Sequence, residues 1–472
     1  MEMDAKGPEV RDRGTADLAH VSSRIELPSE SLSLIRLLTN VVKNPIKTWP
    51  SAVYTAPLFP WSVLGRKYLF VMAPDLIKEV LVGEPEKFEK GIIARRALEP
   101  ALGDAILTSE GARWRWQRRT AAPIFRQESI RRFVPLMIAV AERTRDRWLC
   151  LPAGSEIDVA REMVRTTFDI IFETMLSSRG SINRPAIEQA VTEYLNATSW
   201  LMLLTMIGAP RWIPYPGAIK VRRGITYLRK VLDGLVADAR RNPTGRDDLL
   251  SLLIDAKDPE TGHSMNDEDI RDNLLTFITA GHETTALALT WTLYLLSRHP
   301  TISQRVRGEI ALVTEGSPLA AGHIDQLSYT KQAIQEALRL YPPAPLIVRQ
   351  ARGDFKLGDQ SFKAGTVIYI PVYAVHRHDL LWDKPDIFDP DRFDTDATKA
   401  RNRYAYLPFG AGPRICIGMG FAYAEAISIL AILLRAFDFR ARPGYTPEPK
   451  LRVTLRPDRG MPMILTPLEY CA

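Results

Sequence analysis

A glycine-rich turn around one cysteine constrains this chain more than any other feature. Residues 409–418 read Phe-Gly-Ala-Gly-Pro-Arg-Ile-Cys-Ile-Gly, so an arginine precedes Cys416 by two positions. A thiolate is a soft metal ligand and needs positive surroundings, and glycine lets a backbone approach a flat or bulky group. The stretch therefore predicts that Cys416 is the single protein ligand of a haem iron. The alternative, a buried structural cysteine, would not require these glycines and the arginine.

Composition narrows the class of protein. The 472 residues are 46% hydrophobic, enough for a large core, and Cys150, Cys416 and Cys471 are the only cysteines. Three cysteines are too few for a disulfide framework, so we expect a reducing, cytoplasmic location. The net charge of +7 arises from basic residues interleaved with acidic ones, without a nucleic-acid motif. We therefore expect no nucleic-acid binding, and instead a basic face for an acidic protein partner.

The N-terminal segment does not have the pattern of a targeting or anchoring sequence. Its first 30 residues carry acids at positions 2, 4, 9, 12 and 17 and no apolar run. Transit peptides are poor in acids, and a membrane span needs about 20 apolar residues. We predict a disordered segment over 1–25 and no transmembrane anchor. The apolar stretch 273–297 carries His282 and Glu283 at its centre, which indicates a buried core helix.

Helical periodicity dominates from residue 110 onward. Asn266 is suited to cap a helix that opens with three acidic residues, where the helix dipole favours negative charge. This central helix, about 266–298, would be roughly 45–50 Å long. The predicted fold is thus mainly α, with small β-sheets. Further helices are predicted over 75–82, 111–120, 127–150, 157–177, 184–196, 217–240, 247–256, 300–314, 324–341 and 420–437, and strands over 67–72, 346–350, 353–357 and 366–370 and as a closing pair within 450–466.

Four further motifs precede the cysteine loop. They are Trp114-x-x-x-Arg118, Ala280-Gly281-His282-Glu283-Thr284-Thr285, Glu336-x-x-Arg339 and Asp389-Pro390-Asp391-Arg392-Phe393. In this order and spacing, they closely resemble the motifs of soluble, bacterial-type cytochrome P450 haem-thiolate monooxygenases, from about residue 60 to the C-terminus. The resemblance implies the cytochrome P450 fold, as one haem domain over 26–472 without a fused reductase, with haem b as cofactor.

The resemblance also assigns the residues that hold the cysteine loop. Glu336 and Arg339 lie on one helix face, and Arg392 is expected to join them in a buried ion pair that supports the loop. The alternative is an ordinary surface pair, which stabilises little. Phe409 would pack beside the sulfur, and the N–H of Gly418 would point toward it and tune the iron.

Four side chains are candidates for binding the haem propionates. Two carboxylates beside an apolar macrocycle need charge-assisted donors, for which arginine is well suited. By resemblance these donors are Trp114, Arg118, Arg349 and Arg414. The alternative, a solvated side chain, is most credible for Arg349. His376 is expected to be a packed structural histidine.

The central helix is predicted to carry the catalytic residues. Ala280 and Gly281 are small where a flat cofactor and O₂ need room. By resemblance, Thr284 directs protons to dioxygen and Glu283 relays them from water. The Thr284 hydroxyl also has the option of bonding to the carbonyl four residues earlier. His282 is expected to serve packing.

The resemblance implies a monooxygenase that inserts one oxygen atom from O₂ into a lipophilic substrate by hydroxylation or epoxidation. Electrons would come from a separate ferredoxin or flavodoxin with its reductase, so NAD(P)H acts only indirectly. A basic patch of Arg113, Arg115, Arg119, Arg401 and Arg403 is the expected docking face. A peroxide-dependent or isomerising enzyme and a non-catalytic haem sensor are alternatives that the complete Glu283–Thr284 pair disfavours.

The substrate is constrained least. Segments 92–106, 200–207, 274–285 and 344–348 are expected to line a largely apolar pocket, with 200–207 as either a mobile lid or core. Residues 103–109 and the motif at 280–285 are similar to those of fatty-acid hydroxylases, in which case Arg95 or Arg96 would pair with a carboxylate. Terpenoids, steroids and aromatics stay equally open.

Overall fold

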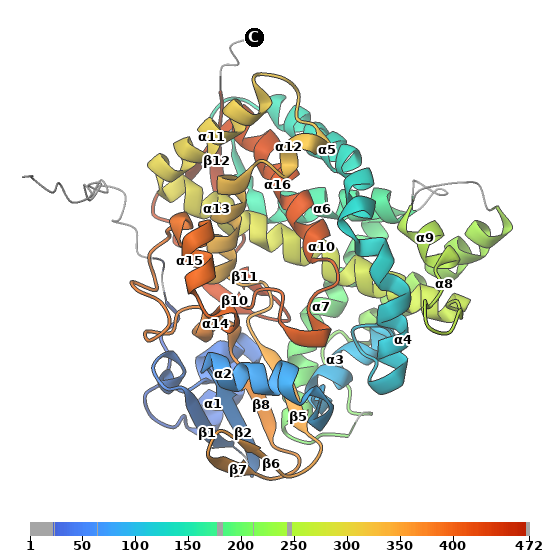
Figure 1. Ribbon diagram of the computed structural model, residues 1–472, viewed down its shortest axis with the longest axis vertical. Helices are drawn as coiled ribbons and strands as arrows, with labels where there is room; N and C mark the ends of the chain where they lie inside the picture. The colour runs from blue at the N-terminus through green and yellow to red at the C-terminus, as the bar shows by residue number, and fades with distance from the viewer. Residues whose placement is uncertain are drawn as a thin grey trace, which may run out of the picture.

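The computed structural model describes Ser22 and residues 24–63, 65–176, 183–210, 212–242 and 248–468. Its long central helix, α10 (Asp267–Arg298), crosses the molecule in Figure 1. A capping box fixes its start, because the Asn266 side chain accepts from the Asp269 N–H at 2.8 Å and the Asp269 carboxylate accepts from the Asn266 N–H at 3.2 Å. The predicted central helix is confirmed almost to the residue.

Helices surround α10 on most of its length, which explains why apolar residues and threonines occupy nearly all of its faces. The principal neighbours are α6 (Val159–Leu176), α8 (Ala218–Arg241), α13 (Ser328–Leu340) and α16 (Met419–Ala436), and α16 in turn packs on α5 (Gln127–Leu149). Among the described residues, α16 is the one helix long and apolar enough to cross a membrane, yet 67% of it is buried. We therefore assign α16 to the core, directly behind the cysteine loop.

The small sheets lie at the edges of this helical body. A five-stranded sheet at the lower end of Figure 1 has the order β1 (Leu58–Val63), β2 (Arg66–Val71), β8 (Val367–Ile370), β5 (Ile347–Ala351) and β3 (Phe88–Glu89). In its parallel pair, Leu69 lies opposite Ile368, which joins the two halves of the chain. Short hairpin strands β6 (Phe355–Leu357) and β7 (Gln360–Phe362) lie beside it. The strands predicted near 67–72 and over 346–370 are thus confirmed.

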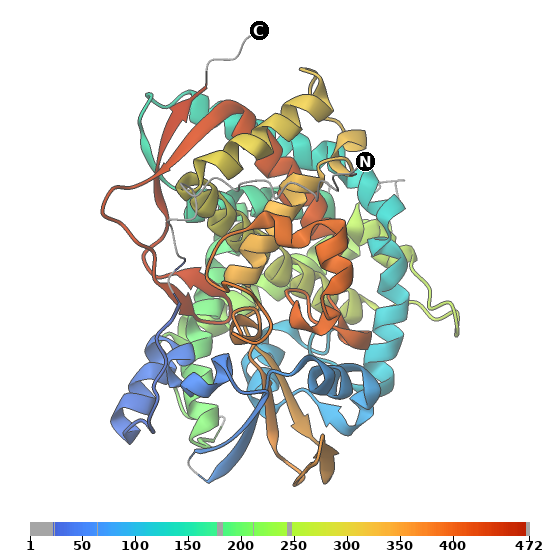
Figure 2. The ribbon, with the colours of Figure 1, turned by 60° about the vertical axis from the view of Figure 1, so that its left-hand side comes forward.

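The C-terminal strands differ from the predicted closing pair. β10 (Pro449–Leu451) and β11 (Leu455–Pro457) form a hairpin, while β12 (Pro462–Pro467) pairs with β9 (Phe437–Ala441) and β4 (Glu156–Asp158) in another sheet, seen in red at the upper left of Figure 2. The prediction of a single strand pair was wrong. Residues 452–454 form the turn between β10 and β11, and the chain then continues into β12, which belongs to a second sheet.

Three helices were missed or were predicted too short. Helix α7 (Arg184–Met206) extends ten residues past its predicted end, so most of the uncharged 200–207 run is helical. Helices α1 (Leu34–Lys43) and α3 (Ile92–Leu102) were not predicted. The other α-helices are α2 (Pro74–Lys78), α4 (Gly111–Ala121), α9 (Leu249–Asp255), α11 (Pro300–Thr314), α12 (Ala321–Ile324), α14 (Val372–Val375) and α15 (Thr395–Ala400).

Most of the segment predicted to be disordered, 1–25, lies outside the described residues. Of the described ones, Ser22 donates from its N–H to the Asp386 carbonyl at 2.9 Å. Ile25 is buried, and its N–H donates to the Tyr373 hydroxyl at 3.2 Å. Ser22 and Ile25 therefore contact the 373–386 segment through their backbone N–H groups.

Candidate active site

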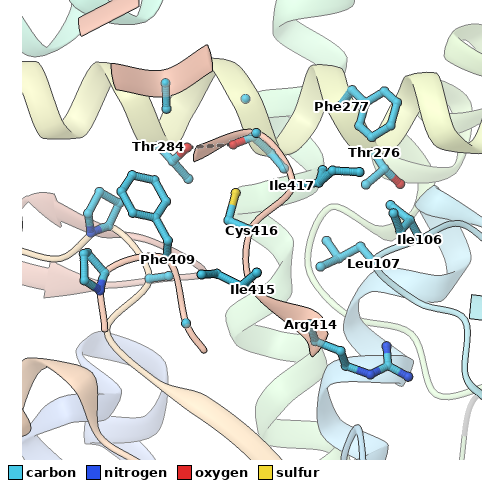
Figure 3. Close-up of a pocket in the computed structure, with 18 of the residues that line it drawn as sticks. Ile106, Leu107, Thr276, Phe277, Thr284, Phe409, Arg414, Ile415, Cys416 and Ile417 are labelled. Carbon is cyan, nitrogen blue, oxygen red and sulfur yellow. Dashed lines mark hydrogen bonds between the residues drawn. The ribbon is translucent and has the colours of Figure 1, made fainter. Parts of the chain in front are cut away.

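A cavity of about 510 Å³ separates the cysteine loop from α10. Figure 3 shows the Cys416 sulfur pointing across this space toward α10, with Thr284 on the opposite wall and Phe409 beside the loop. The structure thus brings together the predicted iron ligand and the predicted catalytic alcohol, although 132 residues separate them in the sequence.

Backbone geometry explains the glycines of the loop. Gly412 has φ +73°, and a Cβ there would lie 2.2 Å from the Leu81 carbonyl oxygen, so no other residue fits this close approach. The Cys416 N–H donates to the Phe409 carbonyl at 2.9 Å and closes the turn. The Phe409 ring packs against the Tyr423 ring, with centroids 5.2 Å apart. The loop is therefore held rigidly, as a metal ligand requires.

The surroundings of Cys416 shift the pKa of its thiol in opposite directions. Burial raises the pKa of its thiol, while the Gly418 N–H directed at the sulfur and the charge of Arg118 lower it. Burial dominates, so the positive surroundings expected from the sequence do not by themselves produce a thiolate. A coordinating metal deprotonates a thiol outright, which makes the site suited to sulfur that is bound to iron.

The predicted support network is buried and fully connected. Glu336 accepts from Arg339 Nε at 2.6 Å and Nη2 at 2.7 Å, and from the Asp389 N–H at 3.0 Å, with Arg392 Nε at 3.4 Å. Arg339 also donates to the carbonyls of His376, Pro385 and Ile387 at 2.6–3.0 Å, which satisfies all five of its N–H groups. Both side chains are 0% exposed. The alternative of a surface ion pair is thereby excluded.

His376 joins this network as a neutral packing group. Its Nε2 accepts from the Leu407 N–H at 2.7 Å, just before the cysteine loop. Burial and the nearby Arg339 charge lower the pKa of His376 to about 3. It does not line the cavity, which agrees with the structural role expected of it.

Cationic side chains gather at one end of the cavity. All four predicted donors, Trp114, Arg118, Arg349 and Arg414, line it. Burial, with the charge of Arg414, lowers the pKa of Arg349 to about 10, so Arg349 is not a solvated surface arginine. Arg414 pairs with Glu110 at 2.5 Å and lies 4.2 Å above the Trp114 ring.

Lys90 belongs to the same cluster and was not predicted. Burial and the charge of Arg414 lower its pKa to about 7. It comes directly after the two-residue strand β3 and lies in no motif, so only its proximity in space to Arg414 and Arg349 identifies it. Lys90, Arg118, Arg349 and Arg414 all line the cavity, and their charge is only partly balanced by Glu110 and by Glu86 near Arg414. The surplus positive charge fits a ligand with two carboxylates, such as haem b with its propionates.

The side chains of Glu283 and Thr284, the predicted catalytic pair on α10, lie in different environments. The Thr284 hydroxyl lines the cavity and donates to the Ala280 carbonyl at 2.8 Å, so the back-bonding alternative holds in this structure. The Glu283 carboxylate does not line the cavity and accepts from Arg456 Nη2 of β11 at 2.6 Å. Arg456 was missed because it is 173 residues away in the sequence.

Two neighbours of the pair have packing roles. Gly281 lines the cavity, and a Cβ there would also lie 2.8 Å from Ile171 Cδ1, so the small residue makes room for α6 as well. The His282 ring packs edge-to-face on Phe168, and its Nδ1 lies 2.6 Å from the Ile278 carbonyl oxygen. The packing role expected of His282 is confirmed.

Glu425 of α16 is a second carboxyl group at the cavity wall. It is fully buried, and neither of its oxygens has a hydrogen-bond partner within 3.5 Å among the described residues, although the Thr285 hydroxyl lies nearby. Burial raises the pKa of Glu425 well above its ordinary value and so favours the neutral form of this carboxyl. Because Glu425 lies within a largely apolar helix and in none of the recognised motifs, the sequence did not identify it as a site residue.

The cavity walls agree with three of the four predicted segments. Residues within 92–106, 274–285 and 344–348 line it. None of the described side chains of segment 200–207 lines it; this segment ends helix α7, where Leu201 and Thr205 are buried. Its prediction as a pocket wall was wrong.

Comparison with known proteins decides the family. The family model for Cytochrome P450 matches residues 49–463. The chain belongs to the cytochrome P450 family. Cyclooctat-9-en-7-ol 5-monooxygenase of Streptomyces melanosporofaciens is 33% identical over 81% of this chain and 82% of its own length. Pentalenene oxygenase of Streptomyces avermitilis is 33% identical over 83% and 86%, and cytokinin hydroxylase of Arabidopsis thaliana is 34% identical over 84% and 78%.

A solved structure agrees with this assignment. The crystal structure of the cytochrome P450DA heme domain superimposes with a TM-score of 0.79 at 27% identity, covering 88% of this chain and 90% of that one. This cytochrome P450 is accordingly a haem-thiolate monooxygenase that binds haem b, uses O₂ and a redox partner, and oxidises lipophilic substrates.

Proposed function

We propose that Cys416 is the iron ligand and that this cytochrome P450 hydroxylates or epoxidises a lipophilic small molecule within the cavity. The observation that carries the proposal is the Cys416 sulfur, which points into the cavity opposite Thr284 and receives the Gly418 N–H. Haem b, when bound there, supplies the activation of O₂. Lys90, Arg118, Arg349 and Arg414, with the Trp114 N–H, hold its propionates.

The chain's own residues then handle protons and water. The Thr284 hydroxyl lies at the cavity wall and donates its proton to the Ala280 carbonyl, which leaves its oxygen free to accept a hydrogen bond from a group in the cavity. Glu283 exchanges protons with water on the side where Arg456, 24% exposed, reaches the surface. Proton transfer from Glu283 to Thr284 requires the carboxylate to leave Arg456, so the strength of this ion pair sets how readily the relay operates.

The walls determine the kind of substrate. Side chains such as Leu98, Ile106, Phe277 and Val348 make the cavity predominantly apolar. Binding a lipophilic molecule there buries apolar surface and removes water from the reacting centre. The relatives named above act, by their names, on chemically different molecules, so the walls of this chain and not its family define its substrate.

We further propose that a ferredoxin or flavodoxin docks on the face nearest Cys416, in the cytoplasm. Most arginines of the basic patch expected from the sequence have acidic partners. Arg113 pairs with Asp104 and Asp269, Arg115 with Glu86, and Arg119 with Asp258 and Glu260. Arg401 lies half-buried over the rings of Trp382 and Phe393. These contacts reduce the free positive charge of those four arginines, whereas Arg403, the fifth member of the expected patch, is exposed and lies over the Tyr404 ring.

Other cations remain on that face. Arg126, Arg132 and Lys331 are exposed and make no ion pair within the described part of the chain. Ile130 contacts Gly420 and Lys331 lies over the Tyr423 ring, so these cations surround the first turns of α16, next to the cysteine loop. Reversing the charges of Arg132 and Lys331 is expected to slow reduction by an acidic ferredoxin, most strongly at low salt. Unchanged rates at low salt would remove this docking face.

The iron-ligand assignment is tested with Cys416→Ser. Wild type is expected to give the thiolate-type Soret band in the reduced CO adduct, and the variant to lose it. Cys150→Ser is the matched control, because Cys150 is exposed and does not line the cavity. A wild-type spectrum from the Cys416 variant would contradict the assignment. NAD(P)H-driven turnover with a ferredoxin system, yielding an oxygenated product, distinguishes a monooxygenase from a peroxide-dependent enzyme.

A further inference from the structure

The 103–109 loop joins α3 to α4 and forms part of the cavity wall. Its residues Ile106, Leu107 and Thr108 line the cavity, and Figure 3 shows Ile106 and Leu107 at the end of the cavity where Thr276 and Phe277 of α10 lie. The loop forms neither helix nor strand, so its position depends on the groups that its backbone contacts. Those groups decide where this part of the wall lies.

Asn273 of α10 contacts the loop at Ile106. The Asn273 Oδ1 accepts from the Ile106 N–H at 3.0 Å, and its Nδ2 donates to the Asp269 carbonyl at 2.8 Å, which fixes the orientation of the amide. The Asn273 side chain is fully buried, and Ile106 is buried as well. Asparagine is a poor helix former, and a buried amide is unfavourable unless it is hydrogen-bonded. A bond that reaches another segment of the chain explains its presence inside α10.

Other side chains hold the two ends of the loop. Near its start, the Asp272 carboxylate accepts from the Asp104 N–H at 3.2 Å. At its end, Arg414 Nη1 donates to the Ser109 carbonyl at 3.2 Å. Asn273 acts between these two points, so the ends of the loop are fixed without it. Its bond decides the position of the middle of the loop, where the side chains face the cavity.

We propose that Asn273 is a positioning residue for substrate specificity, which acts through the Ile106 N–H and fixes how far the Ile106 side chain extends over the bound molecule. Asn273 lies one turn before Phe277 on α10, and Phe277 lines the same cavity. The bond therefore sets the separation between the loop wall and the helix wall, and with it the thickness of the apolar body that fits between them. The inference rests on the proposed function, because it concerns the substrate of the same cavity.

The test uses purified holoenzyme and probes that do not require the natural substrate. Imidazole, 4-phenylimidazole and 4-biphenylylimidazole each bind the haem iron through one nitrogen, so differences between their affinities report on the apolar body. Dissociation constants are measured from the Soret shift. Wild type is expected to prefer at least one aryl probe to imidazole, because the aromatic rings bury apolar surface.

Two substitutions remove this preference by different routes. Asn273→Leu is expected to lower it about three-fold or more, and Ile106→Ala to lower it as well. In the Ile106→Ala background, Asn273→Leu is expected to have no further effect, because Asn273 acts through the Ile106 side chain. Asn273→Ser is a second variant for the same bond, since its hydroxyl bonds to the Asp269 carbonyl four residues earlier but is too short to reach the loop. It supplies the result if the leucine variant does not accumulate as holoenzyme.

Asn44→Leu is the matched control. Asn44 is 4% exposed, accepts from the Leu451 N–H at 3.1 Å and donates to the Pro449 carbonyl at 3.0 Å, so this change removes the same two kinds of bond. None of these three residues lines the cavity. The control is expected to keep the wild-type preference for the aryl probe.

Four outcomes would overturn the proposal. They are equal affinities of all probes in wild type, an unchanged preference in the Asn273 variants, an equal loss in Asn44→Leu, and additive effects in the double variant. Failure of the proposed function would instead appear as a missing thiolate-type band in the reduced CO adduct of wild type.

Discussion

Neutralising Glu336 tests whether the buried network holds the cysteine loop. In Glu336→Gln the side chain keeps its shape but loses the charge that balances Arg339, which is 0% exposed, and Arg392, which is 14% exposed. Removing one partner of a buried ion pair costs about 3–5 kcal/mol. Domains are typically stable by only about 5–15 kcal/mol, so the loss is a large fraction of the total.

The assay is urea unfolding of holoenzyme, followed by far-UV circular dichroism and by the Soret band. Glu268→Gln is the matched control, since Glu268 and Arg271 also form an acid–arginine pair three residues apart, at 2.9 Å, but Glu268 is 73% exposed. That variant is expected to lose less than about 1 kcal/mol. If Glu336→Gln cost no more than Glu268→Gln, the argument from burial would be refuted.

Three further predictions concern the cavity. Burial raises the folded-state pKa of Glu425. Above the unfolded-state pKa of about 4.3, the folded protein therefore keeps a proton that the unfolded chain loses. The free energy of unfolding then falls by about 1.4 kcal/mol per pH unit until the pH reaches the folded-state pKa. Glu425→Gln lacks this slope and should gain stability over wild type as the pH rises; parallel pH profiles of urea midpoints would contradict it. Thr284→Ala is expected to keep its haem but to divert O₂ to peroxide, with product per NAD(P)H lowered several-fold; full coupling would exclude Thr284 from proton delivery. Lys90→Met is expected to speed haem transfer to apomyoglobin about ten-fold or more, because a charge-assisted hydrogen bond contributes about 1.5–3 kcal/mol; an unchanged rate would remove Lys90 from the propionate site.

Sequence reasoning succeeded where a pattern is local. The cap at Asn266 fixed the start of α10, and the spacing of Glu336 and Arg339 placed both on one helix face, as the structure shows. The turn around Cys416 was recognisable because its glycines serve a close backbone approach, seen at Gly412.

Sequence reasoning failed where a role depends on contacts between distant segments. Lys90 and Glu425 acquire shifted pKa values only because folding buries them. Arg456 lies within the predicted C-terminal strand pair, but its contact with Glu283, 173 residues away, depends on the tertiary fold. Gly281 contacts Ile171 of α6, a neighbour that the sequence of α10 alone does not reveal.

The β10–β11 hairpin connects two properties that are usually engineered separately. Leu455 donates its N–H to the carbonyl of Pro343, a cavity-wall residue, and the next residue, Arg456, holds Glu283. Mutations in this hairpin that change substrate binding are therefore expected to change the strength of the Arg456–Glu283 ion pair as well. In variant libraries of this hairpin, substrate selectivity and the fraction of NAD(P)H consumed without product should change together. Such variants need to be screened for both properties from the first round.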